Sequence, residues 1–192
     1  MAQKWHLFFI MWVSGGWKWT LRQNLITQTE VNIDFLKSYV TRDMRPGEVN
    51  WDTYHFISKH NFEKDIKNDD FLEYEWVHKA AYYGTKKSEV EVGLLSGKTM
   101  MKEIDTKWLK QLSENHPDFK ENYTSFFLDV SNDEMVRRYL ERHPEGCKND
   151  IQNRLESASL ERQQAEKYCD YIIDASQPPE KVLEEVLCII QK

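Results

Sequence analysis

The stretch LFFIMWVSGGWKWT, residues 7–20, indicates how the chain folds. Its first part, residues 7–13, is a nearly continuous apolar run, which is typical of a β-strand buried on both faces of a sheet. The Ser-Gly-Gly turn at residues 14–16 ends this strand, and the following residues predict a helix over about 17–29. A strand, a glycine turn and a helix in this order predict an α/β fold with a mainly parallel sheet.

The same alternation continues along the chain. Residues 38–56 indicate a loop with short strands, and Ser131 with Glu134 forms a capping box that predicts a helix start. Strands are expected at 71–77, 99–104, 125–130 and 171–173, and helices near 62–66, at 88–96 (closed by Gly97), from 131, at 149–168 and from 179 onward. In the last helix one apolar stripe is expected, formed by Val182, Leu183, Val186, Leu187 and Ile190.

Composition narrows the class of protein. The chain has 192 residues and a net charge of −6, with 30% charged and 40% apolar residues, which describes one globular domain and argues against disorder or general nucleic-acid binding. No apolar run approaches the roughly 18 residues of a membrane helix, and the run at 7–13 lacks a signal-peptide cleavage site. The three cysteines lack metal-ligand spacing, so a reducing, cytoplasmic setting is expected.

Glycine and tryptophan are present in unusual numbers. Average usage predicts roughly 13 glycines in a chain of this length. The sequence has 7 glycines and 7 tryptophans. The shortfall in glycine relative to average usage is therefore about as large as the number of tryptophans.

The first candidate site is the turn between the first strand and the first helix. A phosphate-binding loop has the pattern G-x-x-x-x-G-K-[ST], whose backbone amides and lysine hold phosphates. Lys18 occupies the lysine position, but Trp12 and Trp17 occupy the glycine positions and Trp19 the hydroxyl position. On these residues alone, an ordinary strand–turn–helix junction is the favoured alternative.

A second candidate is the segment that contains Arg42 and Arg45 beside hydroxyl residues. Guanidinium groups bind a phosphate dianion in a bidentate manner, so the pair predicts a phosphate cradle, with a solvated charged loop as the alternative. Glu73 follows in a predicted strand, where a carboxylate can accept hydrogen bonds from a purine, and Tyr82-Tyr83-Gly84-Thr85 supplies hydroxyls that can reach phosphate. Ordinary strand and core residues would look similar.

Two further sets of charged residues stand out. Glu103-Ile104-Asp105 closes a predicted strand and could hold Mg²⁺ through water or contact a nucleotide, although carboxylates at strand ends often have no such role. Arg138, Arg142 and Arg154 lie on two successive predicted helices. They could converge on a transferring phosphoryl group, and a solvated helix face is the alternative.

The order of these segments resembles the guanylate kinase family. That family has a P-loop, then S-x-x-T-R-x-x-R-x-G-E-x-x-G-x-x-Y-x-F, F-L-E, Y-Y-G-T, a strand ending in D/E-I-D, and a lid with paired arginines. This chain matches in register at Ser38, Thr41, Arg42, Arg45, Gly47, Glu48, Tyr54, Phe56, 71–73, 82–85, 103–105, Arg138, Arg142 and Arg154. The resemblance covers almost the whole chain.

The resemblance implies ATP-dependent phosphorylation of GMP to GDP, with Mg²⁺ bridging the ATP phosphates and no metal ligand assigned to the chain. GMP would be bound by Ser38, Arg42, Arg45, Tyr54, Glu73, Tyr83, Thr85 and Asp105. ATP would be bound by Ser14, Gly15, Gly16, Trp17, Lys18, Trp19 and Thr20. Catalysis by charge stabilisation would use Lys18, Arg138, Arg142 and Arg154.

The resemblance also implies a three-part P-loop NTPase-like domain. The core would be residues 1–36, 87–131 and 159–192, with a small GMP-binding insertion at 37–86 and a helical lid at 132–158. Expected partners are the two nucleotides only, with neither nucleic acid nor membrane, and the protein would be a monomer or homodimer.

Tryptophan occupies family glycine positions at several sites. Trp12, Trp17, Trp51 and Trp108 fall where the family has glycine, and Trp5 and Trp19 fall where glycine is common. One explanation is divergence into a catalytically inactive module that binds phosphorylated protein partners. The other is a codon such as UGA, translated here as tryptophan but read as glycine by the source organism. The intact arginines and Glu73 favour the second explanation.

Overall fold

The computed structural model describes residues 6–13, 18–29, 31–52, 54–77 and 80–191. Contacts between Cα atoms divide the chain into two compact units. The first unit consists of residues 1–7 and 34–102, and the second of residues 8–33 and 103–192. Each unit is considered by itself.

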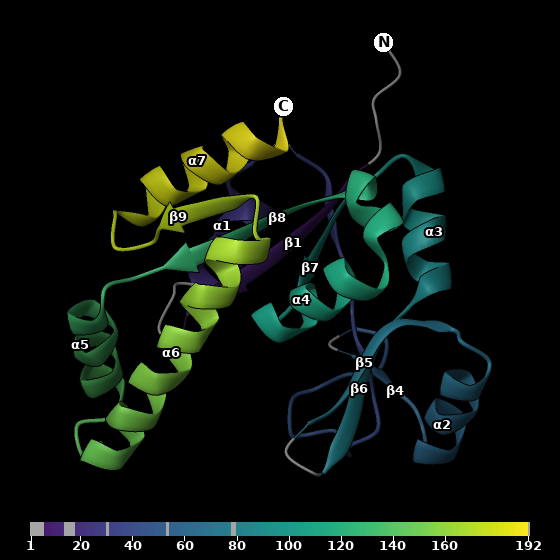
Figure 1. Ribbon diagram of the computed structural model, residues 1–192, viewed down its shortest axis with the longest axis horizontal. Coiled ribbons are helices and arrows are strands. Elements are labelled where there is room, and N and C mark those ends of the chain that lie inside the picture. Colours follow the sequence, from purple (N-terminus) through teal and green to yellow (C-terminus); the bar gives the residue numbers. More distant parts are fainter. Residues whose placement is uncertain (1–5, 14–17, 30, 53, 78–79, 192) are drawn as a thin grey trace. The chain divides into compact units, whose positions relative to one another are not determined.

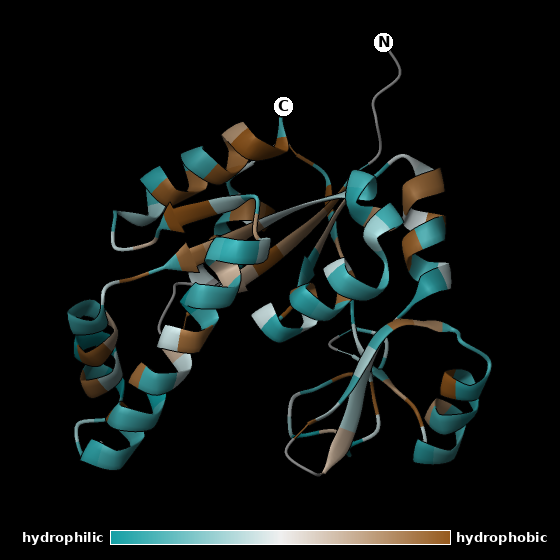
Figure 2. Ribbon diagram, viewed as in Figure 1, coloured by the Kyte–Doolittle hydropathy of each residue, from teal (hydrophilic) through white to brown (hydrophobic). Residues whose placement is uncertain are grey.

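Five strands hydrogen-bond in one sheet. Their order is β2 (Ile33–Phe35), β7 (Thr99–Glu103), β1 (Leu7–Trp12), β8 (Tyr123–Asp129) and β9 (Tyr171–Asp174). β8 and β9 are parallel, with Phe127 opposite Ile172. Nearly all side chains of β1 and β8 are buried, and Figure 2 shows apolar residues along the strands of this sheet. The prediction of an α/β fold with a strand buried on both faces is confirmed.

A second sheet lies entirely in the first unit. Its strands are, in order, β4 (His55–Phe56), β3 (Tyr39–Val40), β6 (Ala81–Lys86) and β5 (Phe71–Val77). β3 is parallel to β4, whereas β6 is antiparallel to both β3 and β5. Its core is aromatic: the buried ring of Phe62 stacks on Phe71 and on Tyr82.

Seven α-helices and one 3₁₀ helix are present in the described ranges: α1 (Lys18–Thr27), α2 (Lys59–Lys67), α3 (Lys87–Ser96), α4 (Thr106–Asn115), η1 (Pro117–Asn122), α5 (Asn132–Arg142), α6 (Lys148–Tyr168) and α7 (Pro179–Ile190). In the second unit α6 packs against both α4 and α5, and α7 packs against α1 (Figure 1). None of these helices combines the length and hydrophobicity needed to cross a lipid bilayer.

The predicted helix ends are confirmed by their hydrogen bonds and backbone angles. Ser131 Oγ accepts a hydrogen bond from the backbone N–H of Glu134 at 3.2 Å, which satisfies one of the free donors at the start of α5. Gly97 ends α3 with a φ of 80°, in the left-handed region that glycine enters without a steric penalty. These local signals depend on neighbouring residues only, so the sequence is sufficient to locate them.

Four elements, β2, β6, α4 and η1, were not among the predicted strands and helices. β6 contains Gly84, a residue that lowers strand propensity. A Cβ at Gly84 would lie 2.7 Å from the carbonyl oxygen of Glu73, so the close approach of β5 and β6 requires glycine there. In α7 three residues of the predicted stripe, Val182, Leu183 and Val186, are buried and the other two are half-buried, and the prediction did not include the buried Ile189.

Candidate functional site

The most interconnected charged group in the first unit surrounds Arg42. Its guanidinium donates to both carboxylate oxygens of Glu48, from Nη1 at 2.5 Å and from Nη2 at 2.6 Å. Its Nε donates to the hydroxyl of Tyr83 at 2.9 Å. The guanidinium carbon also lies 5.2 Å and 5.3 Å from the ring centroids of Tyr54 and Phe56. Arg42 is therefore held in one orientation by groups from β4, β6 and the loop after β3.

The loop after β3 is shaped by its own hydrogen bonds. The backbone N–H of Arg45 donates to Glu48 Oε2 at 2.7 Å, and the backbone N–H of Glu48 donates to the carbonyl of Arg45 at 3.0 Å. Gly47 has a φ of 87°, which allows this turn to close. The hydrogen bond with Arg42 lowers the pKa of Glu48 to about 2, so this carboxylate is ionised at neutral pH.

Arg45 differs from Arg42 in its surroundings. Its side chain is exposed, and its guanidinium forms neither a hydrogen bond nor an ion pair with the part of the chain that the structure describes. Of the two predicted phosphate ligands, Arg42 is pre-oriented and Arg45 can turn toward an incoming anion. An arginine pair of this kind suits a phosphate dianion.

A second polar group lies on the same sheet around Thr85, two residues after Tyr83 in β6. Thr85 is buried and its hydroxyl donates to Glu73 Oε1 at 2.7 Å, and the two residues face each other across β5 and β6. Thr85 and Tyr83 lie on the same face of β6 because side chains alternate along a strand. Two residues of strand span about 7 Å, a separation that a ribose can bridge between a base and a phosphate.

Ser38 continues this row of polar residues. β3 and β6 pair with Tyr39 opposite Gly84, so Ser38 precedes β3 at the level of Thr85. Ser38, Thr85 and Glu73 therefore lie at neighbouring positions across three chain segments. The structure brings together six of the eight predicted GMP ligands around one sheet: Ser38, Arg42, Tyr54, Glu73, Tyr83 and Thr85, with Arg45 in the adjoining loop.

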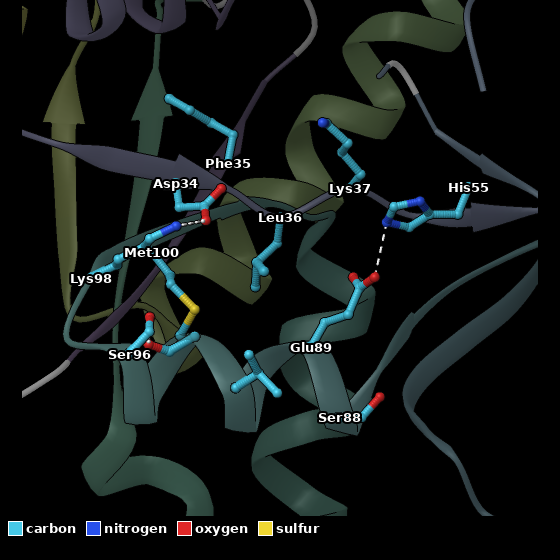
Figure 3. Close-up of a pocket in the computed structure, with 12 residues that line it drawn as sticks. Asp34, Phe35, Leu36, Lys37, His55, Ser88, Glu89, Ser96, Lys98 and Met100 are labelled. Atoms are coloured by element: carbon cyan, nitrogen blue, oxygen red, sulfur yellow. Dashed lines mark hydrogen bonds and ion pairs between the residues drawn. The ribbon is translucent and has the colours of Figure 1, made fainter. Parts of the chain in front are cut away.

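A separate pocket of about 430 Å³ is lined by residues of β2 and the segment after it, by His55 of β4 and by α3 (Figure 3). His55 and Glu89 point toward each other there, with Nε2 and Oε1 2.9 Å apart, and Tyr39 donates to the same Glu89 oxygen. Burial lowers the pKa of His55, so the imidazole is neutral near pH 7 and donates from Nε2. The described residues that line this pocket include none of the predicted nucleotide ligands.

The three predicted catalytic arginines belong to the second unit, and each contacts a group near it. Arg138 is buried and donates to Glu134 at 2.6 Å and to the carbonyl of Ala175 at 3.0 Å. Arg142 donates from Nε to the carbonyl of Arg138 at 3.2 Å. Arg154 lies over the ring of Tyr139 at 4.7 Å. Their placement on two successive helices is as predicted.

The acidic residues after β7 also have partners. Glu103 accepts a hydrogen bond from Arg22 at 3.1 Å, and Asp105 caps α4 by accepting from the backbone N–H of Trp108 at 2.8 Å. Asp105 belongs to the second unit, whereas the other predicted GMP ligands belong to the first.

The predicted ATP site is described only in part. Residues 14–17 lie outside the described residues, as do the side chains of Lys18 and Trp19, although the backbone of both belongs to α1. The chemistry of the Trp19 side chain nevertheless indicates whether this residue could bind Mg²⁺. An indole carries a donor and no oxygen ligand, so Trp19 does not fit the hydroxyl position of a P-loop.

Two of the tryptophans at family glycine positions are in well-described surroundings. Trp51 has a φ of 67°, a left-handed conformation that glycine adopts freely and that β-carbon-bearing residues adopt at a cost. Trp108 is buried in α4, where it packs edge-on against Phe9, and its Nε1 has no hydrogen-bond partner among the described residues. The left-handed backbone of Trp51 and the buried Nε1 of Trp108 each cost stability, and a glycine at either position would not carry that cost.

Sequence reasoning did not assign roles to two residues of the first unit that contact the candidate ligands. Glu48 was matched only as part of the family motif, yet its two carboxylate oxygens accept hydrogen bonds from both terminal nitrogens of the Arg42 guanidinium. Lys102 donates to Ser38 Oγ at 2.7 Å from a buried position in β7. A lysine directly after the apolar pair Met100-Met101 in a predicted strand is the signal that could have pointed to it.

Comparison with known proteins identifies the family of the chain. A model of the family described as guanylate kinase matches residues 8–192. A guanylate kinase of Clostridium tetani is 34% identical over 97% of this chain and 88% of its own length, and one of Buchnera aphidicola is 39% identical over 87% and 78%. The crystal structure of a guanylate kinase from Anaplasma phagocytophilum covers 100% of this chain and 87% of its own, with a TM-score of 0.71 at 22% identity. The chain belongs to the guanylate kinase family and is a nucleoside monophosphate kinase.

Proposed function

We propose that the protein transfers the γ-phosphoryl group of ATP to the phosphate of GMP, giving ADP and GDP. In this reaction the bond between the γ-phosphorus and the bridging oxygen of ATP breaks, and a bond from a GMP phosphate oxygen to that phosphorus forms. Both products remain charged, so the chain's work is to position the reactants and stabilise negative charge.

One observation supports the acceptor half of this proposal most strongly. Tyr83 and Thr85 lie two residues apart on the same face of β6. Tyr83 contacts Arg42, a group suited to a phosphate, and Thr85 contacts Glu73, a group suited to a purine. The remaining Nη2 N–H of Arg42 and the hydroxyl of Tyr83 would bind phosphate oxygens, and Glu73 would accept from the purine N–H groups. Ser38, Arg45 and Tyr54 would complete the GMP site.

For the donor half we propose the segment at 14–20 as the ATP phosphate site, with Lys18 reaching the phosphates. Arg138, Arg142 and Arg154 would stabilise the transferring group after leaving their present partners, and Asp105 would approach the nucleotide in the same rearrangement. Residues 37–86 would then act as the GMP-binding region and 132–158 as a lid on the remaining core. Mg²⁺ would accompany ATP, but because Trp19 offers no ligand, no step is assigned to the ion.

A second function is a catalytically inactive module that binds phosphorylated protein partners. Two observations favour it: Arg42 is held by Glu48 and Tyr83, and tryptophan interrupts the P-loop pattern in the sequence. Both functions predict binding of phosphate near Arg42, but only the kinase requires ATP turnover.

The test is a pair of measurements on the full chain: GMP binding by titration calorimetry, and GDP formation from GMP and ATP. Binding of GMP with turnover establishes the kinase. Stronger binding of a phosphoserine peptide than of GMP, without turnover, establishes the binding module. The Lys98→Met variant is a matched control, because Lys98 pairs with Asp34 on the surface and should change neither measurement.

A further inference from the structure

Lys102 is an unusual residue for its position. It lies in β7 after the buried Met100 and Met101, and only 3% of its surface is exposed. A buried ammonium group is costly unless it is hydrogen-bonded, so its partners indicate why it is there. Its Nζ donates to Ser38 Oγ at 2.7 Å and to the carbonyl of Leu36 at 3.3 Å. All three residues belong to the first unit.

The contact determines which hydrogen bond Ser38 can offer. An ammonium group has donors only, so Ser38 Oγ is necessarily the acceptor in this pair. A serine hydroxyl has a single hydrogen, and that hydrogen then remains available to donate elsewhere. The backbone of Ser38 is also held, because its carbonyl accepts from the N–H of His55 at 2.9 Å. Ser38 is therefore a fixed hydroxyl whose orientation is biased toward donation.

Ser38 stands at the end of the row that contains the proposed purine ligands. It is level with Thr85, which in turn faces Glu73 across the neighbouring strand. Glu73 can only accept hydrogen bonds, whereas Ser38 beside Lys102 favours donating. A guanine presents the matching pattern, with N–H donors on one part of its edge and the O6 acceptor beside them, whereas adenine presents an N6 amino donor in the O6 position.

We propose that Lys102 is a specificity-determining residue, which acts through Ser38 to select nucleoside monophosphates whose base carries an oxygen at the 6-position. It is a positioning residue, because it sets the direction of the Ser38 hydrogen bond and leaves the transferring phosphate untouched. This inference rests on the proposed binding of GMP near Glu73. It assigns the reading of the 6-oxygen to Lys102 and Ser38, and the reading of the N–H groups to Glu73.

The two assignments can be separated with three nucleotides. GMP and IMP share the 6-oxygen, and AMP has an amino group there; only GMP has the 2-amino group. In Lys102→Met the affinities for GMP and IMP should both fall about tenfold, the equivalent of one hydrogen bond, while AMP binding stays the same or improves. In Glu73→Gln the affinity for GMP should fall more than that for IMP. Dissociation constants are measured by calorimetry, so turnover is not needed.

A double-variant cycle tests whether Lys102 acts through Ser38. Ser38→Ala should reproduce the loss seen in Lys102→Met, and the combined variant should lose little more than either alone. Lys102→Arg keeps a cationic donor and should keep the preference for 6-oxo bases, so it carries the test if Lys102→Met does not fold. Lys98→Met is the matched control directly before the same strand and should alter none of the three affinities.

Distinct results overturn the inference and the proposed function. If GMP and AMP affinities fall by the same factor in Lys102→Met, or if the Ser38 and Lys102 effects add, or if Lys102→Arg loses the preference, Lys102 has only a structural role. If the unaltered chain does not bind GMP at all, the proposed function fails and the role of Lys102 fails with it.

Discussion

The arginines of the first unit and those of the second unit are held in different ways. Arg42 has partners from separate chain segments, namely Glu48 in the following loop, Tyr83 on β6 and the ring of Tyr54 beside β4. Arg138 is buried and bonds both to Glu134 on its own helix and to the carbonyl of Ala175. Arg142, which is exposed, instead bonds to the carbonyl of Arg138, four residues earlier on the same helix. A sheet cluster assembled from distant segments is formed once the sheet folds, whereas helix-surface contacts of this kind are weak and exchangeable.

This difference indicates a division of labour between the two regions. Arg42 is already oriented by its partners and keeps one Nη2 N–H for a phosphate, so this cluster should determine acceptor affinity. The arginines of α5 and α6 must exchange local partners before they can contact a nucleotide, so they should affect transfer more than binding.

The largest expected effect concerns the donor half. Changing Trp12→Gly, Trp17→Gly and Trp19→Gly together should raise GDP formation at least about 100-fold, because small residues let backbone amides approach phosphate closely. The dissociation constant for GMP should stay within about twofold, since the acceptor residues are untouched. A coupled assay and calorimetry measure the two quantities.

If the triple variant binds GMP but is no faster than the unaltered chain, the kinase proposal loses its donor half and the binding module is favoured. The gene itself provides a second check. UGA codons at the tryptophan positions would support a recoded glycine, and UGG codons would exclude it.

Arg42→Met should weaken GMP binding by about 100-fold, because it removes charge-assisted hydrogen bonds from the phosphate. Arg154→Met should leave GMP affinity within about threefold, since its guanidinium lies over Tyr139 in the second unit. Calorimetry measures the GMP affinity of both variants and so tests whether the two regions differ. Equal losses would show that the regions do not differ as described.

Acid should weaken both regions through their carboxylates. Hydrogen bonds from Arg42 and from Arg137 lower the pKa values of Glu48 and Glu134, respectively, to about 2 from an ordinary 4.5. A lowered folded-state pKa means that the unfolded chain binds more protons between these values, so the stabilisation is complete above pH 4.5 and is lost toward pH 2. Urea unfolding across this range should show a falling midpoint, with a shallower slope in Glu48→Gln and in Glu134→Gln.

The smallest expected effect is at Trp51. Trp51→Gly should raise the free energy of unfolding by about 1 kcal/mol, because the left-handed backbone no longer carries a β-carbon. The matched control is Trp76→Gly in β5, which should destabilise the protein because it removes the ring that packs on Tyr82 at 4.4 Å. Thermal unfolding of both variants measures the difference. A loss of stability in Trp51→Gly would mean that its contact with His55 outweighs the backbone strain.

Much of the fold could be predicted because its signals are local. The apolar run of β1, the Ser131 cap and the Gly97 end of α3 each depend on residues within a few positions. β6 was missed because its need for Gly84 arises from the backbone of β5, a long-range contact. The arginine and glutamate positions of the candidate site were found from motif spacing, but the partner that holds each side chain was not.

The sequence by itself therefore determined the α/β class, the order of most helices and strands, and the residues that form the candidate GMP site. Only the tertiary structure decided that Glu48 holds Arg42, that Lys102 donates to Ser38, and that Trp51 takes a left-handed backbone. The physical reason is that a side chain's hydrogen-bond direction, ionisation and backbone strain depend on which distant segments pack around it, whereas helix and strand periodicity depends on near neighbours.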